Sequence, residues 1–290
     1  MIERPASDRP AKVLWAAMAT AGCLGIAAVV WPVIEVLDQP LRIAAYIIAL
    51  IYWLKISGDH PKGSTMRTAW LLLAWSSGVS IIRHSFAWAN YFAKWPVSIR
   101  SFSQFPTMIA LALLIAGLFA IWFGFAAIGL GVRFRRSDPI WVAVMGILAF
   151  VPYLFSWRAV SGYAVIYPLV SLSPLLLAVP LLIALLLHRI EQEMGGGQLA
   201  TSLRLIVAFL LMRLVALTMN SPALASFTVS KILVGVSGWT SIWFFALAAA
   251  YRWRLTLSIR ELTYRYQTDP EAELAGLVLL AENQQDVARR

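Results

Sequence analysis

The sequence predicts an all-α integral membrane protein, a polytopic bundle of about eight transmembrane helices. Hydrophobic residues make up 60% of its 290 residues and charged residues only 13%, a composition that excludes an ordinary soluble domain. Long apolar stretches alternate with short polar connections, and these connections are alternately rich and poor in Arg and Lys. The first pattern indicates a lipid environment, and the second indicates an orientation.

Each of the apolar stretches can be interpreted as one span, because about 20 helical residues cross a hydrocarbon core of about 30 Å. The predicted spans run from about Val13 to Leu37, Leu41 to Leu54, Thr68 to Ser85, Pro106 to Val132, Ile140 to Trp157, Tyr163 to Leu187, Ala200 to Met219 and Ala225 to Tyr251. The predicted bundle therefore covers residues 13–251. Residues 1–12 and 252–290 form its two tails.

The distribution of basic residues predicts that both termini are cytoplasmic. With the amino terminus inside, seventeen of the 24 Lys and Arg residues fall on the inner side, and the others are Arg42, Arg83, Lys94, Arg100, Arg158, Arg213 and Lys231. An inner excess is the usual sign of cytoplasmic loops. We expect a bacterial cytoplasmic (inner) membrane. The net charge of +10 is then mostly a sign of topology, and no nucleic-acid partner is expected because the basic residues are scattered.

A short similarity suggests two interpretations of the chain's organisation. Residues 121–123 and 242–244 both read Ile-Trp-Phe, and in each case an Arg follows eleven residues after the Trp, at Arg133 and Arg254. A 4+4 parallel repeat, as found in some transporters, is one explanation. Chance is the other, because apolar helices commonly end in Trp and Arg at the membrane interface.

Basic side chains in the outer half of the bundle are the main candidates for a binding site. A charge at membrane depth is costly, so such residues often mark a site. We expect an outward basic and aromatic vestibule that binds an anionic ligand or a lipid headgroup, formed by Arg83, His84, Arg158, Arg213, Lys231, Glu35 as counter-ion, Trp88 and Trp95. The alternative is that the basic side chains extend to the headgroups and the aromatic residues of a loop at 86–105 form an interfacial belt. Arg213 lies deepest, and either a cavity or lipid is compatible with its position.

The sixth predicted span contains Pro168, Pro174 and Pro180. Interior prolines remove backbone hydrogen bonds and kink helices. A broken helix of this kind could line a substrate path. Kinks also serve plain helix packing.

The sequence indicates no catalytic site, metal site or cofactor. His60, His84 and His188 fall at separate helix ends, so no two of them are expected to share a metal or haem. Hydrolase, metalloprotease and nucleotide-binding motifs are missing from the sequence. The lone Cys23 excludes an intrachain disulfide.

The carboxyl-terminal tail is the expected docking site for a cytoplasmic or membrane protein. Residues 252–266 are basic and aromatic and are expected to lie along the inner membrane surface. Asp269 and Pro270 then resemble the cap and first turn of an amphipathic helix. In topology alone, several spans followed by a cytoplasmic helix, the layout resembles the sensory input modules of bacterial histidine kinases.

These features favour a non-enzymatic multi-pass membrane protein that acts as a sensor or scaffold. The alternative is a small secondary transporter, or permease, for an anionic or amphipathic solute. That alternative rests on the proline-rich span, Arg213 and the short repeat. An intramembrane transferase is favoured least, because paired catalytic groups are missing from the sequence.

Overall fold

The computed structural model describes residues 9–94, 105–127, 137–156, 173–193, 197–221 and 223–268. Almost all of the chain in these ranges is helical, and they contain no strand. Five helical segments are long and apolar enough to cross a membrane: Ala11–Val30, Val33–Gly58, Phe105–Ala127, Thr201–Met219 and Thr228–Ile259. The chain is therefore an all-helical integral membrane protein. The number of spans and the side on which the termini lie stay predictions.

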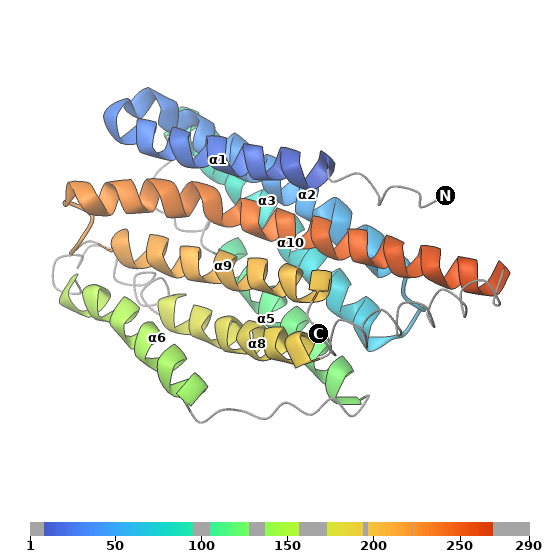
Figure 1. Cartoon of the computed structure of the whole chain (residues 1–290). Helices are drawn as coiled ribbons and strands as arrows, with labels where there is room; N and C mark the ends of the chain where they lie inside the picture. Colours follow the sequence, from blue (N-terminus) through green and yellow to red (C-terminus); the bar gives the residue numbers. More distant parts are fainter. Residues whose placement is uncertain are drawn as a thin grey trace, which may run out of the picture.

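Figure 1 shows the helices running side by side as a bundle. In chain order they are α1 (Arg9–Val30), the short 3-10 helix η1 (Pro32–Leu37), α2 (Asp38–Gly58), α3 (Thr65–Ala93), α5 (Phe105–Ala127), α6 (Ser137–Ser156), α8 (Ser173–Glu193), α9 (Gly197–Met219) and α10 (Thr228–Thr268).

The first helix ends earlier than predicted because of Pro32. The residue before a proline is disfavoured in the α conformation, and Trp31 is extended, with φ −120° and ψ 90°. The chain then passes through η1 into α2. The predicted span from Val13 to Leu37 is thus wrong at its end. The short second span is instead a helix of 21 residues, Asp38–Gly58.

Helix α3 is longer than predicted and contains residues that were expected in an outer loop. It begins after Ser64, whose side chain caps it by accepting a hydrogen bond from the Arg67 amide at 3.2 Å. The helix ends before Lys94, which is left-handed, with φ 48°. No Gly or Pro between Gly78 and Pro96 interrupts it. Trp88 therefore lies on a helix, 41% exposed, with its ring 5.9 Å from that of Phe92.

Helix α10 also continues beyond its predicted end at Tyr251. It contains 41 residues and is about 60 Å long at 1.5 Å per residue. No Gly or Pro occurs between Gly238 and Pro270 to end it sooner. Residues 252–266, predicted to lie along the membrane surface, are instead a continuation of α10, visible as the long orange to red helix in Figure 1.

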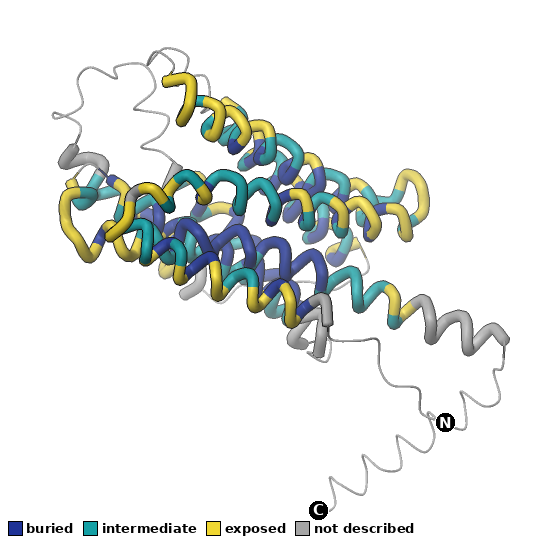
Figure 2. The backbone as a smooth tube through the Cα atoms, turned by 90° about the horizontal axis from the view of Figure 1, so that it is seen from above, coloured by how far each residue is buried: buried dark blue, intermediate teal, exposed yellow. Residues whose placement is uncertain are grey.

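Helix α10 lies at the centre of the packing. It contacts α1, α2 and α9, and the contacts continue from α2 to α3, α5, α8 and back to α9, so that six helices form a closed circuit. Helix α1 packs outside this circuit on α10, and α6 packs on α8 and α9. Every residue of α10 from Ser237 to Ala250 except Phe244 is buried. Figure 2 shows such buried residues gathered along the middle of the bundle.

The closest approach between helices occurs where α1 crosses α10. A Cβ atom added to Gly25 would lie only 2.5 Å from the carbonyl oxygen of Gly235, and a Cβ on Gly235 would collide with the backbone of Gly25 in the same way. Small residues permit such backbone contact between membrane helices. Both positions therefore require glycine.

We predict that Gly25→Ala lowers the free energy of unfolding by about 1–3 kcal/mol, the usual cost of overpacking. Gly78→Ala is the matched control, because nothing lies within 4 Å of its added Cβ. This control should be neutral or stabilising by about 0.5–1 kcal/mol, since glycine disfavours helix. Thermal unfolding in maltoside micelles measures both changes. Equal stability of the two variants would contradict the proposed close contact.

Candidate functional site

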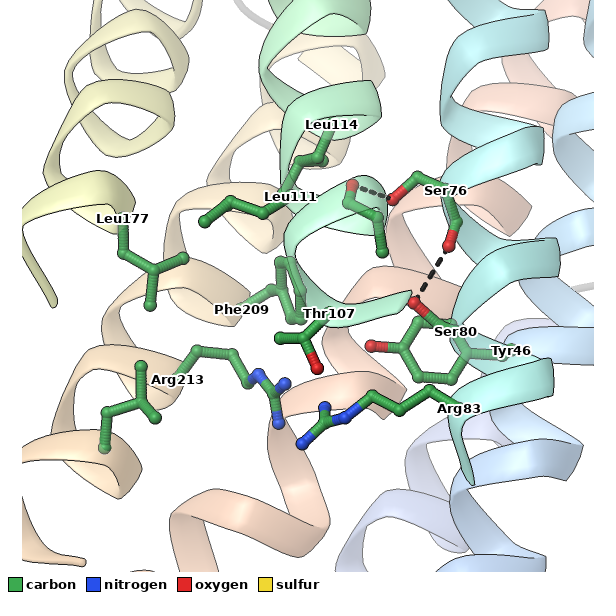
Figure 3. Close-up of a pocket in the computed structure, with 12 residues that line it drawn as sticks. Tyr46, Ser76, Ser80, Arg83, Thr107, Leu111, Leu114, Leu177, Phe209 and Arg213 are labelled. Atoms are coloured by element: carbon green, nitrogen blue, oxygen red, sulfur yellow. Dashed lines mark hydrogen bonds between the residues drawn. The ribbon is translucent and has the colours of Figure 1, made fainter. Parts of the chain in front are cut away.

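A central cavity of about 100 Å³ lies within the circuit of helices. Its polar lining residues are Tyr46 from α2, Ser76, Ser80 and Arg83 from α3, Thr107 from α5 and Arg213 from α9. Its apolar lining residues are Ala110, Leu111, Leu114, Leu177, Phe209 and Leu217. Figure 3 shows the two arginines at one end of the cavity and Leu111 and Leu114 at the other. The cavity is therefore amphipathic.

The two arginines face each other across the cavity. Figure 3 shows the guanidinium group of Arg83, from α3, pointing toward that of Arg213, from α9. Among the described residues, no carboxylate lies within ion-pairing distance of either group, and the nearby Asp38 pairs with Arg42 instead. Two like charges repel strongly in a medium of low dielectric constant. A carboxylate or phosphate between them would pair with both, which is the geometry that guanidinium groups favour.

Hydroxyl groups line one side of the cavity between its two ends. Ser76 donates to the carbonyl oxygen of Ala110 at 2.7 Å, and Ser80 donates to that of Ser76 at 2.8 Å, so the backbone satisfies both donors. The buried Oγ1 of Thr107 has no hydrogen-bond partner in the described part of the chain. A buried polar atom without a partner is costly. Thr107 is therefore available to a ligand.

A chain of polar contacts runs behind the arginines from α2 to α3. Arg42 Nε donates to Asp38 Oδ1 at 2.6 Å, and Gln39 Nε2 donates to Asp38 Oδ2 at 3.0 Å. His84 Nδ1 lies 2.7 Å from Gln39 Oε1. Because an amide oxygen only accepts, His84 Nδ1 is the donor. The His84 ring is 2% exposed and stacks on Tyr46, with centroids 5.5 Å apart.

These polar contacts determine which charges are neutralised. Both oxygens of Asp38 already accept hydrogen bonds, one of them from its ion-pair partner Arg42. Asp38 is therefore committed to Arg42 and leaves Arg83 and Arg213 without a carboxylate partner of their own. The polar end of the cavity carries an excess of positive charge.

A second cavity of about 470 Å³ opens where α1 ends and α2 begins. Its charged lining residues are Glu35, Asp38, Arg42 and Lys231. The vestibule predicted from the sequence thus corresponds to two cavities: Arg83 and Arg213 line the first, and Glu35 and Lys231 line the second. His84 lines neither cavity but belongs to the polar contacts from α2 to α3. Trp88 lines neither, and Arg158 and Trp95 lie outside the described residues.

Several residues of these sites were not candidates from the sequence. Arg42, Gln39, Tyr46 and Thr107 are in this group. The spacing of Asp38 and Arg42, four residues apart on a helix, is a recognisable signal of an ion pair. Thr107 and Gln39 give no signal in the sequence, because their importance depends on which helices face each other.

Comparison with protein-family models, with curated proteins and with solved structures finds no match for this chain. Among the residues that the structure describes, no group of three or more His, Cys, Asp or Glu residues is placed to hold a metal ion. Function must therefore be argued from the cavities themselves.

A second polar cluster lies at the opposite end of the bundle. Trp70 Nε1 donates to His60 Nε2 at 3.0 Å, and the guanidinium carbon of Arg252 lies 4.9 Å from the centre of the Trp70 ring. Partial burial lowers the pKa of His60, and the charge of Arg252 lowers it further, against an opposing effect of Asp59. His60 is therefore a neutral acceptor that holds Trp70.

We predict that acid weakens this end of the bundle. Because the pKa of His60 is lower in the folded state than its unfolded value near 6.5, its stabilising effect is present above that value and is lost as the pH falls through the folded-state pKa. His60→Gln keeps an acceptor for Trp70 but cannot titrate. The melting temperature of wild type should fall more than that of the variant between about pH 8 and about pH 5. Parallel curves would exclude His60 as the cause.

Proposed function

We propose that the chain is a non-enzymatic membrane protein, a sensor or scaffold, that binds an anionic ligand between Arg83 and Arg213. The observation that carries this proposal is the pair of facing guanidinium groups in a cavity, with no carboxylate partner among the described residues. An ion between them offsets their mutual repulsion and their desolvation. The unpartnered hydroxyl of Thr107 adds a further donor.

The rest of the cavity supports a ligand with an apolar part. Leu111, Leu114 and Leu177 line the end away from the arginines. The volume of about 100 Å³ is below the range of about 300–1,000 Å³ typical of drug-sized ligands. These features favour a small carboxylate or phosphate with a short apolar chain.

Packed aromatic rings support the role of a sensor. The ring of Phe209, in the cavity wall, lies 5.0 Å from that of Phe245 on α10. Phe245 lies 5.7 Å from Trp53, which stacks on Trp70 at 5.4 Å. Arg252 of α10 lies over Trp70. A shift of Phe209 on ligand binding would therefore be passed to α10, whose residues 252–268 are the first part of the proposed docking tail.

Binding of hexyl phosphate in maltoside micelles tests the proposal. We expect hexyl phosphate to raise the melting temperature of wild type, whereas the uncharged hexanol should not. Arg83→Gln and Arg213→Gln should each weaken binding by about 10- to 100-fold, because a hydrogen bond to a charged group contributes about 1.5–3 kcal/mol.

Two further variants make this test specific. Arg204 is exposed on the same helix as Arg213, and Arg204→Gln should bind as wild type does. Asp38→Asn removes the carboxylate near the site and should strengthen binding, although it lowers stability. Wild-type affinity in Arg213→Gln would refute the proposed site.

Transport is a second candidate function, favoured by the polar chain between the two cavities. Asp38 lines the second cavity, and its contacts through Gln39 reach His84 beside the first. An anion could exchange between them if these contacts opened. The solute would then be the same anionic or amphipathic class.

The contacts among six of the helices agree with the 4+4 parallel repeat on which this candidate also rests, but those of the first helix in each half do not, since α1 packs on α10 whereas α6 packs on α8 and α9. In an eight-helix count, α2, α3 and α5 of the first half correspond to α8, α9 and α10 of the second. The contacts α2 to α3, α3 to α5 and α5 to α8 then correspond to α8 to α9, α9 to α10 and α10 to α2, and all of these occur. In this scheme Arg83 and Arg213 occupy equivalent helices.

Reconstitution into liposomes distinguishes transport from sensing. A transporter should move a radiolabelled anion, such as acetate or phosphate, at a rate that falls at least about tenfold in Arg213→Ala. Arg204→Ala is the control. If both proteins bind hexyl phosphate but show no flux above empty liposomes across a broad anion panel, transport is excluded and the sensor proposal stands.

A further inference from the structure

The second cavity presents one unpaired charge of each sign. Glu35 comes from η1 and Lys231 from the first turn of α10, and both side chains are exposed. Neither forms an ion pair with another described residue, and they do not pair with each other. A carboxylate and an ammonium group therefore line the same cavity without forming an ion pair.

The other charges of this cavity are already satisfied. Asp38 and Arg42 neutralise each other at 2.6 Å, and the second oxygen of Asp38 accepts from Gln39. Glu35 and Lys231 are thus the charges available to a ligand. One attracts a cation, and the other attracts an anion.

From this arrangement we infer that the second cavity is a binding site for a zwitterion. The ligand carries a primary ammonium group, bound by Glu35, and a phosphate or carboxylate, bound by Lys231. The buried Trp239 in the wall supplies an aromatic ring, which also attracts ammonium groups. Asn220 lies in the same lining and offers an amide donor and an acceptor. This site is separate from the Arg83 and Arg213 cavity and does not depend on the function proposed for it.

The same chemistry has two sources at this end of the bundle. A phosphatidylethanolamine headgroup contains an ammonium and a phosphate, and so does free phosphoethanolamine. The cavity lies where α1 ends, at a helix end, so a lipid headgroup and a dissolved molecule can both reach it.

The first experiment uses wild-type protein in non-ionic maltoside micelles. Phosphoethanolamine should raise the melting temperature and change tryptophan fluorescence at concentrations at least about tenfold lower than phosphate or ethanolamine, because only the zwitterion satisfies both charges at once. If phosphate alone acts as well as phosphoethanolamine, the site is not a zwitterion site.

The second experiment uses nanodiscs of phosphatidylglycerol with and without phosphatidylethanolamine. A response only to the lipid identifies the headgroup as the ligand, and a response to the dissolved molecule identifies a free zwitterion. Either response supports the site when it depends on Glu35 and Lys231. If neither probe changes the melting temperature or the fluorescence, the inference is refuted.

Variants connect the response to the two side chains. Glu35→Gln and Lys231→Gln should each weaken the response at least about tenfold, and their melting temperatures without ligand should match wild type because both side chains are exposed. Lys12 is exposed on α1 and does not line the cavity. Lys12→Gln is therefore the matched control and should respond as wild type does. Arg213→Gln should also respond normally, which separates this site from the first. Wild-type responses in Glu35→Gln and Lys231→Gln would overturn the inference.

Discussion

The position of α10 is the constraint on which the rest of the structure depends. Lipid provides no hydrophobic force between helices, so association depends on close packing and on polar contacts. Gly25 and Gly235 allow α1 and α10 to touch through their backbones. Ser202 of α9 donates to the carbonyl oxygen of Ala248 on α10 at 2.9 Å. Tyr46 and Phe209 line the central cavity, and their rings both pack against the ring of Phe245 on α10. The shape of the cavity therefore depends on this helix.

The distribution of charge follows from the same packing. Helices α2 and α9 pack on α10, and α3 packs on α2. Together they carry Arg42, Arg83 and Arg213 to one end of the bundle. A single carboxylate, Asp38, pairs with the first of these. Neutralising all three with protein carboxylates would make an unreactive ion-pair network. Arg83 and Arg213 instead line a cavity without a carboxylate partner among the described residues, so their charges stay available to the anion that we propose.

The sequence predicted much of this fold because hydropathy and the proline signals act locally. The break at Pro32 was visible in the sequence, although the first span was extended beyond it. Helix α3 carries Ser76, Ser77 and Ser80 and is not among the five segments apolar enough to cross a membrane, yet its position as a helix was predicted. The continuation of α3 and α10 was missed, because aromatic and basic residues suggest a membrane interface whether or not the helix ends there. Arg83 and Arg213 were candidates because basic residues in the outer half of the predicted bundle often mark a site, and both line the central cavity. The division into two cavities could not be predicted, since it depends on how α2 and α3 are rotated against each other, and the stacking of Tyr46 on His84 fixes that rotation.

The two candidate functions make different demands on the contacts between the cavities. A transporter must break the hydrogen bonds from Asp38 through Gln39 to His84 in every cycle, because a solute cannot pass while these groups hold α2 against α3. A sensor benefits from keeping these contacts intact, because they join α3, which carries Arg83, to α2, which packs on α10. Both oxygens of Asp38 accept hydrogen bonds among these contacts, and His84 is almost fully buried beside them. These hydrogen bonds hold α2 against α3 and favour a rigid wall over a gate, although His84 Nε2 is buried without a partner. We therefore propose the sensor ahead of the transporter.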